Sequence, residues 1–295
     1  MKIIVTGSLG HISKPLVEKL TSAKHDVTVI SSNADRKSEI EALGATATIG
    51  SVSDLAFLSG TFKGADAVYT MVPPTFGASD WKQHIAGIGK LYAQAIAAAG
   101  VKNAVNLSSM GAHMPDGCGP VSGLFYVEQA LNALEGVNVK HLRPGFFYYN
   151  FLANIGMIKH MGIIGGNYGE SAKLVLANPA DIADAAAEEL SNLAFTGKSI
   201  RYITSDEKTT DEVASILGKA IGKPDLKWIN FTDEDTVGGM LQNGLPLDVA
   251  KNYAEMGAAM RSGEMASEYL NNRPATFGKT NFEAFAPVFA AAFAQ

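Results

Sequence analysis

Short apolar, β-rich runs alternate with helical patterns along the first 145 residues, and this alternation limits the possible folds more than any other feature of the chain. Six such runs are separated by five stretches with helical periodicity. Parallel strands need a crossover between them, and a helix usually supplies it. We therefore predict an α/β fold with a doubly wound parallel sheet. The runs are KIIVTG, HDVTVIS, ATATIG, DAVYTMV, KNAVNLSS and VNVKHLRPG, and the helices are expected over 11–23, 34–43, 53–62, 80–99 and 122–134.

The loop after the first run, VTGSLGHIS at residues 5–13, has the context of a dinucleotide-binding turn. Gly7 follows an apolar strand, and Gly10 comes three residues later at the start of an amphipathic helix. Gly7 would permit the tight turn, and Gly10 would let a pyrophosphate reach N–H groups at the positive end of the helix. Ser13 stands where a third glycine is usual, and its small side chain should not block the phosphate. The alternative is a turn that uses glycine only for backbone freedom, but five consistent βα units favour a nucleotide and a Rossmann-like sheet.

The second run ends in SSNADRK, without the acid that usually holds the free 2′-hydroxyl of NAD. Ser31, Ser32 and Arg36 could instead bind a 2′-phosphate, because a guanidinium forks onto phosphate oxygens. We therefore predict that NADP(H) is preferred over NAD(H). The alternative is that Asn33 or Asp35 caps the next helix and that Arg36 is solvated.

Two further strand ends should complete the cofactor crevice. The fourth run ends in TMVPPTF, where Met71, Val72 and Pro73 would wall the adenine and the ribose, unless the two prolines merely end the strand. The fifth ends in NLSSMGAH, where Ser108 is expected to bind the cofactor and Ser109 would meet a reacting carbonyl.

Three residues are candidates for catalysis, namely Ser109, His113 and Tyr126. His113 could act as a general acid, although a loop histidine is more often solvated. Tyr126 lies at the start of the next helix, but Ala130 stands four residues later, where a dehydrogenase would have a lysine that lowers the phenol pKa. The Tyr and Lys pair is therefore incomplete.

Composition argues against several classes of partner. The net charge of −5 and the pI near 5.7 argue against a nucleic acid. The single cysteine, Cys118, cannot form an internal disulfide, and the most apolar C-terminal stretch, FAPVFAAAF, is too short to cross a bilayer. The six histidines are scattered, so no metal site is expected. We expect a cytoplasmic monomer or homodimer with a small-molecule substrate, without nucleic acid or membrane partners.

Several stretches together resemble the NmrA-like branch of the atypical short-chain dehydrogenase/reductase superfamily, over most of the chain. They are VTGSLGHIS, AVNLSSMGA, VEQAL and, above all, LRPGFFYYNFL at 142–152. The resemblance implies a dinucleotide-binding domain, placed here at 1–150, and a substrate-side cap, placed at 151–295, with 172–205 completing the main sheet. It also implies cofactor contacts from the glycine loop, Arg36, the fourth strand end and the segment after the sixth strand: Gly7, Ser8, Leu9, Gly10, His11 and Ile12 for the pyrophosphate, Val72 and Pro73 for the ribose side, and Pro144, Gly145 and Phe146 for the nicotinamide.

These observations leave two main functions open. The first is an NAD(P)H-dependent oxidoreductase that passes a hydride to a small planar acceptor, such as a quinone or an unsaturated carbonyl. The aromatic run FFYYNFL could supply a flat apolar wall, unless alternate rings are core. The second is a non-catalytic NADP(H) sensor, which Ser13 and Ala130 favour. A sugar-nucleotide epimerase is weaker, because it needs the missing Tyr and Lys pair.

Overall fold

Seven parallel strands form the main sheet of the computed structural model, which describes residues 1–295. Their spatial order is β10-β6-β5-β4-β1-β2-β3, so the order reverses between β1 and β4. In open α/β sheets this reversal opens a crevice at the carboxyl ends of the strands. All six expected strands are confirmed. These six are β1 (Lys2–Val5), β2 (Asp26–Ser31), β3 (Thr46–Ile49), β4 (Ala67–Thr70), β5 (Asn103–Leu107) and β6 (Asn138–Pro144), and the seventh strand of the sheet is β10 (Lys198–Ile203).

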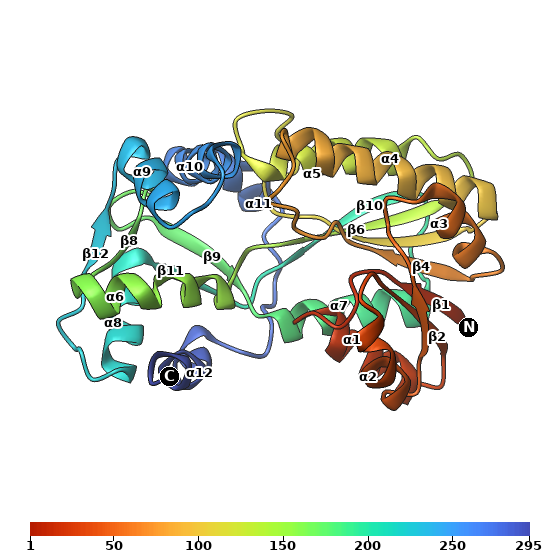
Figure 1. Cartoon of the computed structure of the whole chain (residues 1–295), viewed down its shortest axis with the longest axis horizontal. Coiled ribbons are helices and arrows are strands. Elements are labelled where there is room, and N and C mark those ends of the chain that lie inside the picture. Colours follow the sequence, from red (N-terminus) through yellow and green to blue (C-terminus); the bar gives the residue numbers. More distant parts are fainter.

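Helices cover both faces of this sheet, as the alternating pattern predicts (Figure 1). One face carries α1 (Ser13–Ser22), α2 (Lys37–Ala42) and α7 (Pro179–Asn192), and the other carries α3 (Leu55–Phe62), α4 (Trp81–Ala99) and α5 (Pro120–Asn132). A short 3-10 helix, η1 (Ala34–Arg36), leads into α2. Each face buries its own apolar cluster, which removes both sides of the parallel strands from water. The α/β doubly wound class is therefore confirmed.

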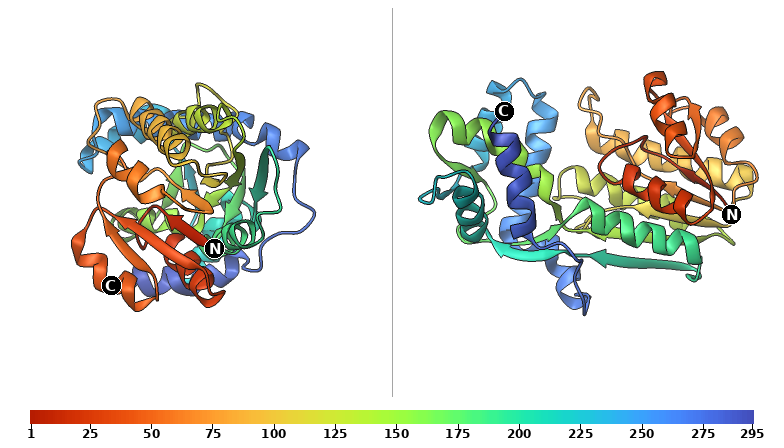
Figure 2. Two further views of the ribbon diagram at one scale, coloured as in Figure 1. Left: turned by 90° about the vertical axis from the view of Figure 1, so that its right-hand side faces the viewer. Right: turned by 90° about the horizontal axis from the view of Figure 1, so that it is seen from below.

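Two smaller sheets lie beyond the main one. The first contains β7 (Phe146–Phe147), β9 (Lys173–Ala177) and β11 (Asp206–Thr209), and the second pairs β8 (Ile164–Gly166) with β12 (Trp228–Asn230). The expectation that 172–205 completes the main sheet holds for β10 but is wrong for β9, which pairs with β7 and β11. β9 lies close to the chain just after β6, because a Cβ added to Gly145 would lie only 2.4 Å from the carbonyl oxygen of Val175. β10 runs on into β11 and so links the two sheets (Figure 2).

Helices surround these small sheets. The stretch Gly244–Pro246 separates two of them, since α9 ends before it and α10 begins after it. A capping box, in which Thr209 and Glu212 cap each other's backbone N–H groups, opens α8. These elements are η2 (Tyr148–Asn154), α6 (Ile155–Met161), α8 (Thr210–Ala220), α9 (Asp233–Gln242), α10 (Leu247–Ser262), η3 (Glu264–Ala266), α11 (Ser267–Asn271) and α12 (Phe282–Phe293). No helix is both long and apolar enough to span a membrane.

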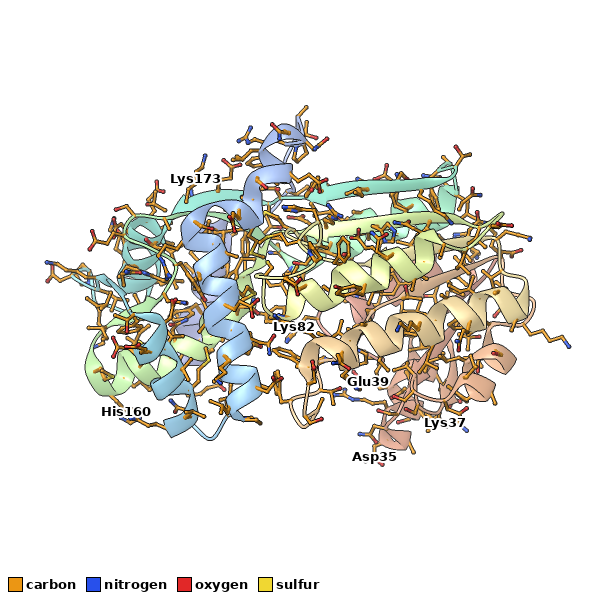
Figure 3. The ribbon with its side chains drawn as sticks, turned by 90° about the horizontal axis from the view of Figure 1, so that it is seen from above. Asp35, Lys37, Glu39, Lys82, His160 and Lys173 are labelled. Carbon is orange, nitrogen blue, oxygen red and sulfur yellow. The ribbon has the colours of Figure 1, made fainter.

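Helix α10 docks on the start of α4. The Lys82 ammonium lies 2.7 Å from a carboxylate oxygen of Glu255, at the junction seen in Figure 3. The backbone N–H of Trp81 donates to Asp248 across 2.9 Å, and the Trp81 and Tyr253 rings meet edge to face at 5.3 Å. These contacts hold the C-terminal helices beside the carboxyl ends of the main strands.

Candidate functional site

The loop between β1 and α1 has the backbone that its two glycines predict. Gly7 adopts a φ of +92°, and a Cβ there would lie 2.7 Å from Met71 Sδ. Ser8 has a φ of 54°, and its N–H donates to the carbonyl of Ile30 across 3.0 Å. The turn therefore lies tightly against β2 and the end of β4, where another residue in place of Gly7 would be both strained and crowded.

The N–H groups that follow this turn are free to bind a ligand. Those of Leu9, Gly10, His11 and Ile12 donate to no backbone carbonyl, and α1 begins without a side-chain cap. A Cβ on Gly10 would find only the carbonyl oxygen of Gly7, at 3.8 Å, so the space above it is open. Free N–H groups at a helix start, beside a backbone that can be closely approached, suit a pyrophosphate. These residues fit a dinucleotide.

Ser13 occupies the position where a third glycine is usual. Its side chain is buried, and its hydroxyl donates to the carbonyl oxygen of Thr6 across 3.4 Å. The serine thus packs α1 against β1 and points away from the open space above Gly10.

The end of β2 contains both cationic and capping groups. Ser31 is buried and already hydrogen-bonded to Ser8 and Asn33, whereas Ser32 is exposed. The Asn33 side chain accepts the N–H of Asp35 across 2.9 Å, so the capping interpretation of Asn33 is confirmed. Arg36 is about half exposed, and its guanidinium lies 2.6 Å from a carboxylate oxygen of Glu39. Glu39 was missed from the sequence, although its spacing of three from Arg36 could have indicated the pair.

Met71, Val72 and Pro73 follow β4 at the same edge and are partly exposed. The N–H of Met71 donates to Thr6 Oγ1 across 2.9 Å, and its carbonyl accepts the Tyr92 hydroxyl across 2.6 Å. These bonds fix the backbone beside the glycine loop, where the sequence predicts the adenine and ribose side.

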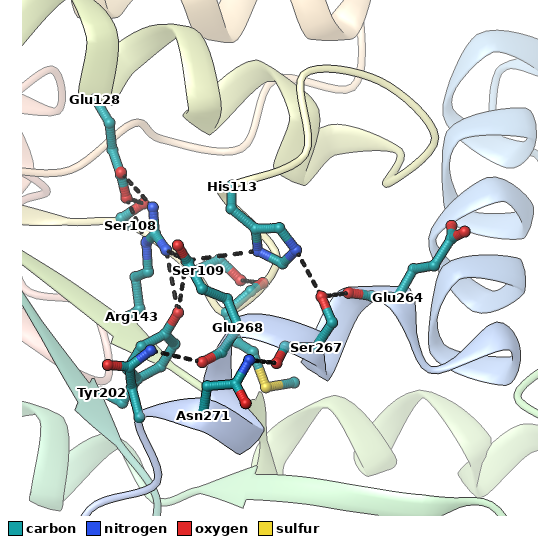
Figure 4. Close-up of polar contacts among 12 residues, drawn as sticks. Ser108, Ser109, His113, Glu128, Arg143, Tyr202, Glu264, Ser267, Glu268 and Asn271 are labelled. Atoms are coloured by element: carbon teal, nitrogen blue, oxygen red, sulfur yellow. Dashed lines mark hydrogen bonds and ion pairs between the residues drawn. The ribbon is translucent and has the colours of Figure 1, made fainter.

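A buried polar network lies where β5 and β6 end (Figure 4). The Ser108 hydroxyl donates to Glu128 across 2.5 Å, and Glu128 receives two bonds from the Arg143 guanidinium, at 2.9 and 2.7 Å. Arg143 also binds Tyr202 and Glu268, so residues from α5, β6, β10 and α11 meet here. Bonds to Glu128 raise the pKa of Arg143 above its usual value despite burial, which keeps the guanidinium charged.

The three catalytic candidates lie in different surroundings. The Ser109 hydroxyl donates to the carbonyl of Met110 across 2.9 Å. His113 joins the network in Figure 4, because its Nε2 lies 3.1 Å from the Ser267 hydroxyl and its Nδ1 lies 3.8 Å from Glu268. Tyr126 is 44% exposed on α5, where its ring packs edge to face on Phe125. Ser109 and His113 both lie in the loop that follows β5, whereas the Tyr126 hydroxyl makes no hydrogen bond within the chain.

The aromatic run after β6 divides into two groups. Tyr148 and Phe151 are fully buried core residues, as the alternative interpretation predicts. Phe147 and Tyr149 are partly exposed and pack on each other with ring centroids 5.4 Å apart. Tyr149 also packs on His11 of the glycine loop at 4.7 Å, a contact that sequence spacing could not reveal. Burial raises the pKa of Tyr149 to about 12, so its phenol is neutral at physiological pH.

Pro144, Gly145 and Phe146 continue β6 directly into this run. Pro144 and Gly145 are buried, and Phe146 is partly exposed, with its ring packed on Phe151 at 5.2 Å. The carbonyl of Pro144 accepts the N–H of Met110, so the ends of β5 and β6 are tied together.

Other catalytic chemistry has little support. Burial raises the pKa of the Cys118 thiol to about 12, which leaves it protonated and a poor nucleophile. No three side chains of His, Cys, Asp or Glu come together in an arrangement that could hold a metal ion.

Two curated proteins are similar to this chain in sequence. A relative from Streptomyces griseus, a (4-alkanoyl-5-oxo-2,5-dihydrofuran-3-yl)methyl phosphate reductase, is 25% identical over 97% of this chain and 99% of its own length. An agroclavine dehydrogenase from Claviceps fusiformis is 28% identical over 58% of each chain.

Solved structures share the fold. An NADPH-dependent quinone oxidoreductase from Escherichia coli, complexed with NADPH, has a TM-score of 0.79 and 23% identity, with 99% of this chain and 98% of that chain covered. A triphenylmethane reductase from Citrobacter sp., complexed with NADP(H), has a TM-score of 0.80 and 20% identity, with 98% and 100% covered. The model of the NmrA-like family matches residues 1–257. The chain therefore belongs to the NmrA-like family.

Proposed function

We propose that this chain is an NAD(P)H-dependent oxidoreductase that reduces a small planar acceptor, such as a quinone or an unsaturated carbonyl. The observation that carries the proposal is the set of free N–H groups over Leu9–Ile12, at the uncapped start of α1 and beneath the open face of Gly10. The curated relatives, a reductase and a dehydrogenase, support an oxidoreductase. The name of the Streptomyces griseus relative's substrate denotes an unsaturated lactone, which supports the unsaturated carbonyl.

The chain's own residues would bind, orient and shield the reactants. The loop N–H groups would hold the pyrophosphate, and Met71 to Pro73 would wall the adenosine. A bound dihydronicotinamide supplies the hydride with its two electrons. Tyr149, which packs on His11, and Phe147, which packs on Tyr149, would offer a planar acceptor a flat apolar surface next to the cofactor loop. Alignment in such a cleft is the main contribution that a hydride transfer needs from the protein.

The polar side of the acceptor would meet the end of β5. We propose Ser109, His113 and Tyr126 as the residues that contact the acceptor or supply its proton. His113 carries a hydrogen bond to Ser267 that fixes the ring. A quinone needs little acid assistance, so an acceptor of this class would tolerate Ala130 in place of lysine.

NADP(H) is the cofactor that we propose as preferred. Arg36 lies just beyond β2, where the adenosine ribose of a dinucleotide is expected in this kind of fold. Its guanidinium can form two bonds to a 2′-phosphate.

A panel of acceptors tests the function. Purified protein is mixed with NADPH or NADH and with benzoquinones, naphthoquinones, unsaturated lactones and unsaturated ketones, and the absorbance of the reduced nicotinamide is followed. Turnover that disappears in a Gly10→Ala variant is the expected result. Tight NADPH binding without turnover on any acceptor would instead support the sensor, a reading favoured by Ala130 and by the network that links Ser108 to Glu268 on α11.

A further inference from the structure

A single carboxylate connects two cations beside the dinucleotide loop. Glu39 on α2 lies 2.6 Å from the Arg36 guanidinium through Oε2 and 3.2 Å from the Lys14 ammonium through Oε1. Lys14 is the second residue of α1, directly after the loop, and Arg36 ends the 3-10 helix after β2. The two cations thus come from two different elements and meet at Glu39, near the end of β2, where the adenosine ribose of a dinucleotide is expected.

A ligand can replace Glu39 in these ion pairs at a small cost in free energy. The side chains of Lys14, Glu39 and Arg36 are 46%, 38% and 48% exposed, and pairs that water reaches so freely contribute little to stability. Hydrogen bonds from Arg36 and then Lys14 lower the pKa of Glu39, so its carboxylate is charged at neutral pH. A phosphate monoester carries about −1.5 to −2 charges and three acceptor oxygens, so it competes well for the same two cations.

We propose that Glu39 is a specificity-determining residue that moderates the preference for a 2′-phosphate by occupying Arg36 and Lys14. The inference rests on the proposed function, because it assumes a dinucleotide on the glycine loop. A 2′-phosphate must displace the Glu39 carboxylate from both cations and then remain close to its negative charge. A cofactor with a free 2′-hydroxyl leaves the three side chains as they are. Glu39 therefore weakens NADPH binding selectively and brings the affinities of the two cofactors closer together.

Calorimetric titration of the full chain with NADPH and with NADH tests this role. The Glu39→Gln variant keeps the side chain's size and removes its charge, so NADPH should bind roughly threefold to tenfold more tightly, while NADH changes less than about twofold. Glu41→Gln is the matched control, because Glu41 lies on the same helix and pairs at 3.9 Å with Lys37 (Figure 3 labels Lys37 and Glu39). The control should change neither affinity.

A second pair of probes isolates the phosphate itself. Adenosine 2′,5′-bisphosphate should gain affinity in Glu39→Gln, and adenosine 5′-phosphate should not. Lys14→Gln should weaken NADPH more than NADH, and it should reduce the gain from Glu39→Gln because one of the two released cations is absent.

The outcomes of these titrations distinguish a failure of the inference from a failure of the proposed function. Weaker NADPH binding in Glu39→Gln would mean that Glu39 positions Arg36 for the phosphate, and it would overturn the proposal. Equal gains for NADPH and NADH would overturn it too. Both results leave the oxidoreductase intact, because they concern binding and not turnover. Failure of both dinucleotides to bind the unaltered chain would overturn the inference and the cofactor site together.

Discussion

The Ser13 hydroxyl donates a hydrogen bond to the carbonyl oxygen of Thr6 across 3.4 Å, from the first residue of α1 to the end of β1. This bond places the serine side chain between helix and sheet. The open face of the loop lies instead over Gly10, where an added Cβ would meet only a carbonyl oxygen at 3.8 Å. The two positions should therefore respond differently to substitution.

Ser13→Gly should keep NADPH affinity within about threefold of the unaltered chain. The substitution removes one weak bond and places glycine in a first helical turn, which costs at most about 1 kcal/mol of unfolding free energy. Calorimetry and urea denaturation measure the two quantities. A loss of binding above tenfold would mean that the hydroxyl contacts the cofactor.

Gly10→Ala should fold with an unchanged melting temperature and lose at least about tenfold in dinucleotide affinity. The added methyl group contacts no side chain, but it occupies the surface that a pyrophosphate must approach. Gly7→Ala is the contrasting variant, because its φ of +92° and the contact with Met71 at 2.7 Å strain the fold itself. Undiminished NADPH binding by Gly10→Ala would place the phosphates elsewhere.

Arg143→Leu should lower the free energy of unfolding by about 3–5 kcal/mol. The substitution leaves Glu128, which is 3% exposed, as a buried charge without its partner. The double variant Arg143→Leu with Glu128→Leu should recover much of the loss, because it removes both charges. Urea denaturation of the single and double variants measures this coupling.

Arg201 provides the matched control for Arg143. It lies on the neighbouring strand β10 and also pairs with two glutamates, Glu188 and Glu189, but it is 35% exposed. Its replacement by leucine should cost at most about 1 kcal/mol. Equal losses of unfolding free energy at Arg143 and Arg201 would contradict the prediction that burial makes the Arg143 pair costlier to break.

Stability should fall as the pH drops from about 6.5 to about 4, because of His141. Its buried imidazole lies 3.2 Å from the Asn106 amide nitrogen and 3.0 Å from Asn132 Oδ1, and burial lowers its pKa to about 4. Between these pH values the unfolded chain binds a proton that the folded chain does not, so the folded state loses stability as the pH falls. The part of the unfolding free energy due to this residue is about 3 kcal/mol.

Urea denaturation at several pH values measures this dependence. His141→Gln should flatten the slope between pH 4 and 6.5, whereas the exposed His160→Gln should leave it unchanged. An unchanged slope in His141→Gln would assign the acid sensitivity to another group.

Local sequence patterns predicted the main sheet, because its strands and helices are consecutive and each carries its own periodicity. The starts of α3 and α4 are examples of such local signals, since Asp54 and Asp80 each accept the backbone N–H of the residue three positions later. The small sheet of β7, β9 and β11 could not be found in this way. β7 has only two residues and ends at Phe147, and its partner β9 begins only at Lys173, so nothing local marks the pair.

Local patterns predict where the candidate site lies, but they do not predict several of its contacts. The glycine loop and the ends of β2, β4 and β5 follow from the strand order alone. Glu268 lies 125 residues from Arg143, and Tyr149 packs on His11 of the glycine loop, so these partners depend on the tertiary fold. Glu39 was within reach of helix spacing, but an exposed acid on a short helix gave no reason to single it out.

His113→Ala should lower turnover with an unsaturated carbonyl by about 100-fold or more and leave NADPH affinity unchanged, if this histidine supplies the proton as we propose. The effect on a quinone should be much smaller, because the reduced quinone oxygen needs little acid assistance. Ser267→Ala is the control, since it removes the hydrogen bond at Nε2 but keeps the imidazole, and it should cost less than His113→Ala. Ser109→Ala and Tyr126→Phe, assayed in the same way, rank the remaining candidates. Equal losses on both acceptors would show that His113 shapes the cleft, because a proton donor must act most strongly on the acceptor that is hardest to protonate.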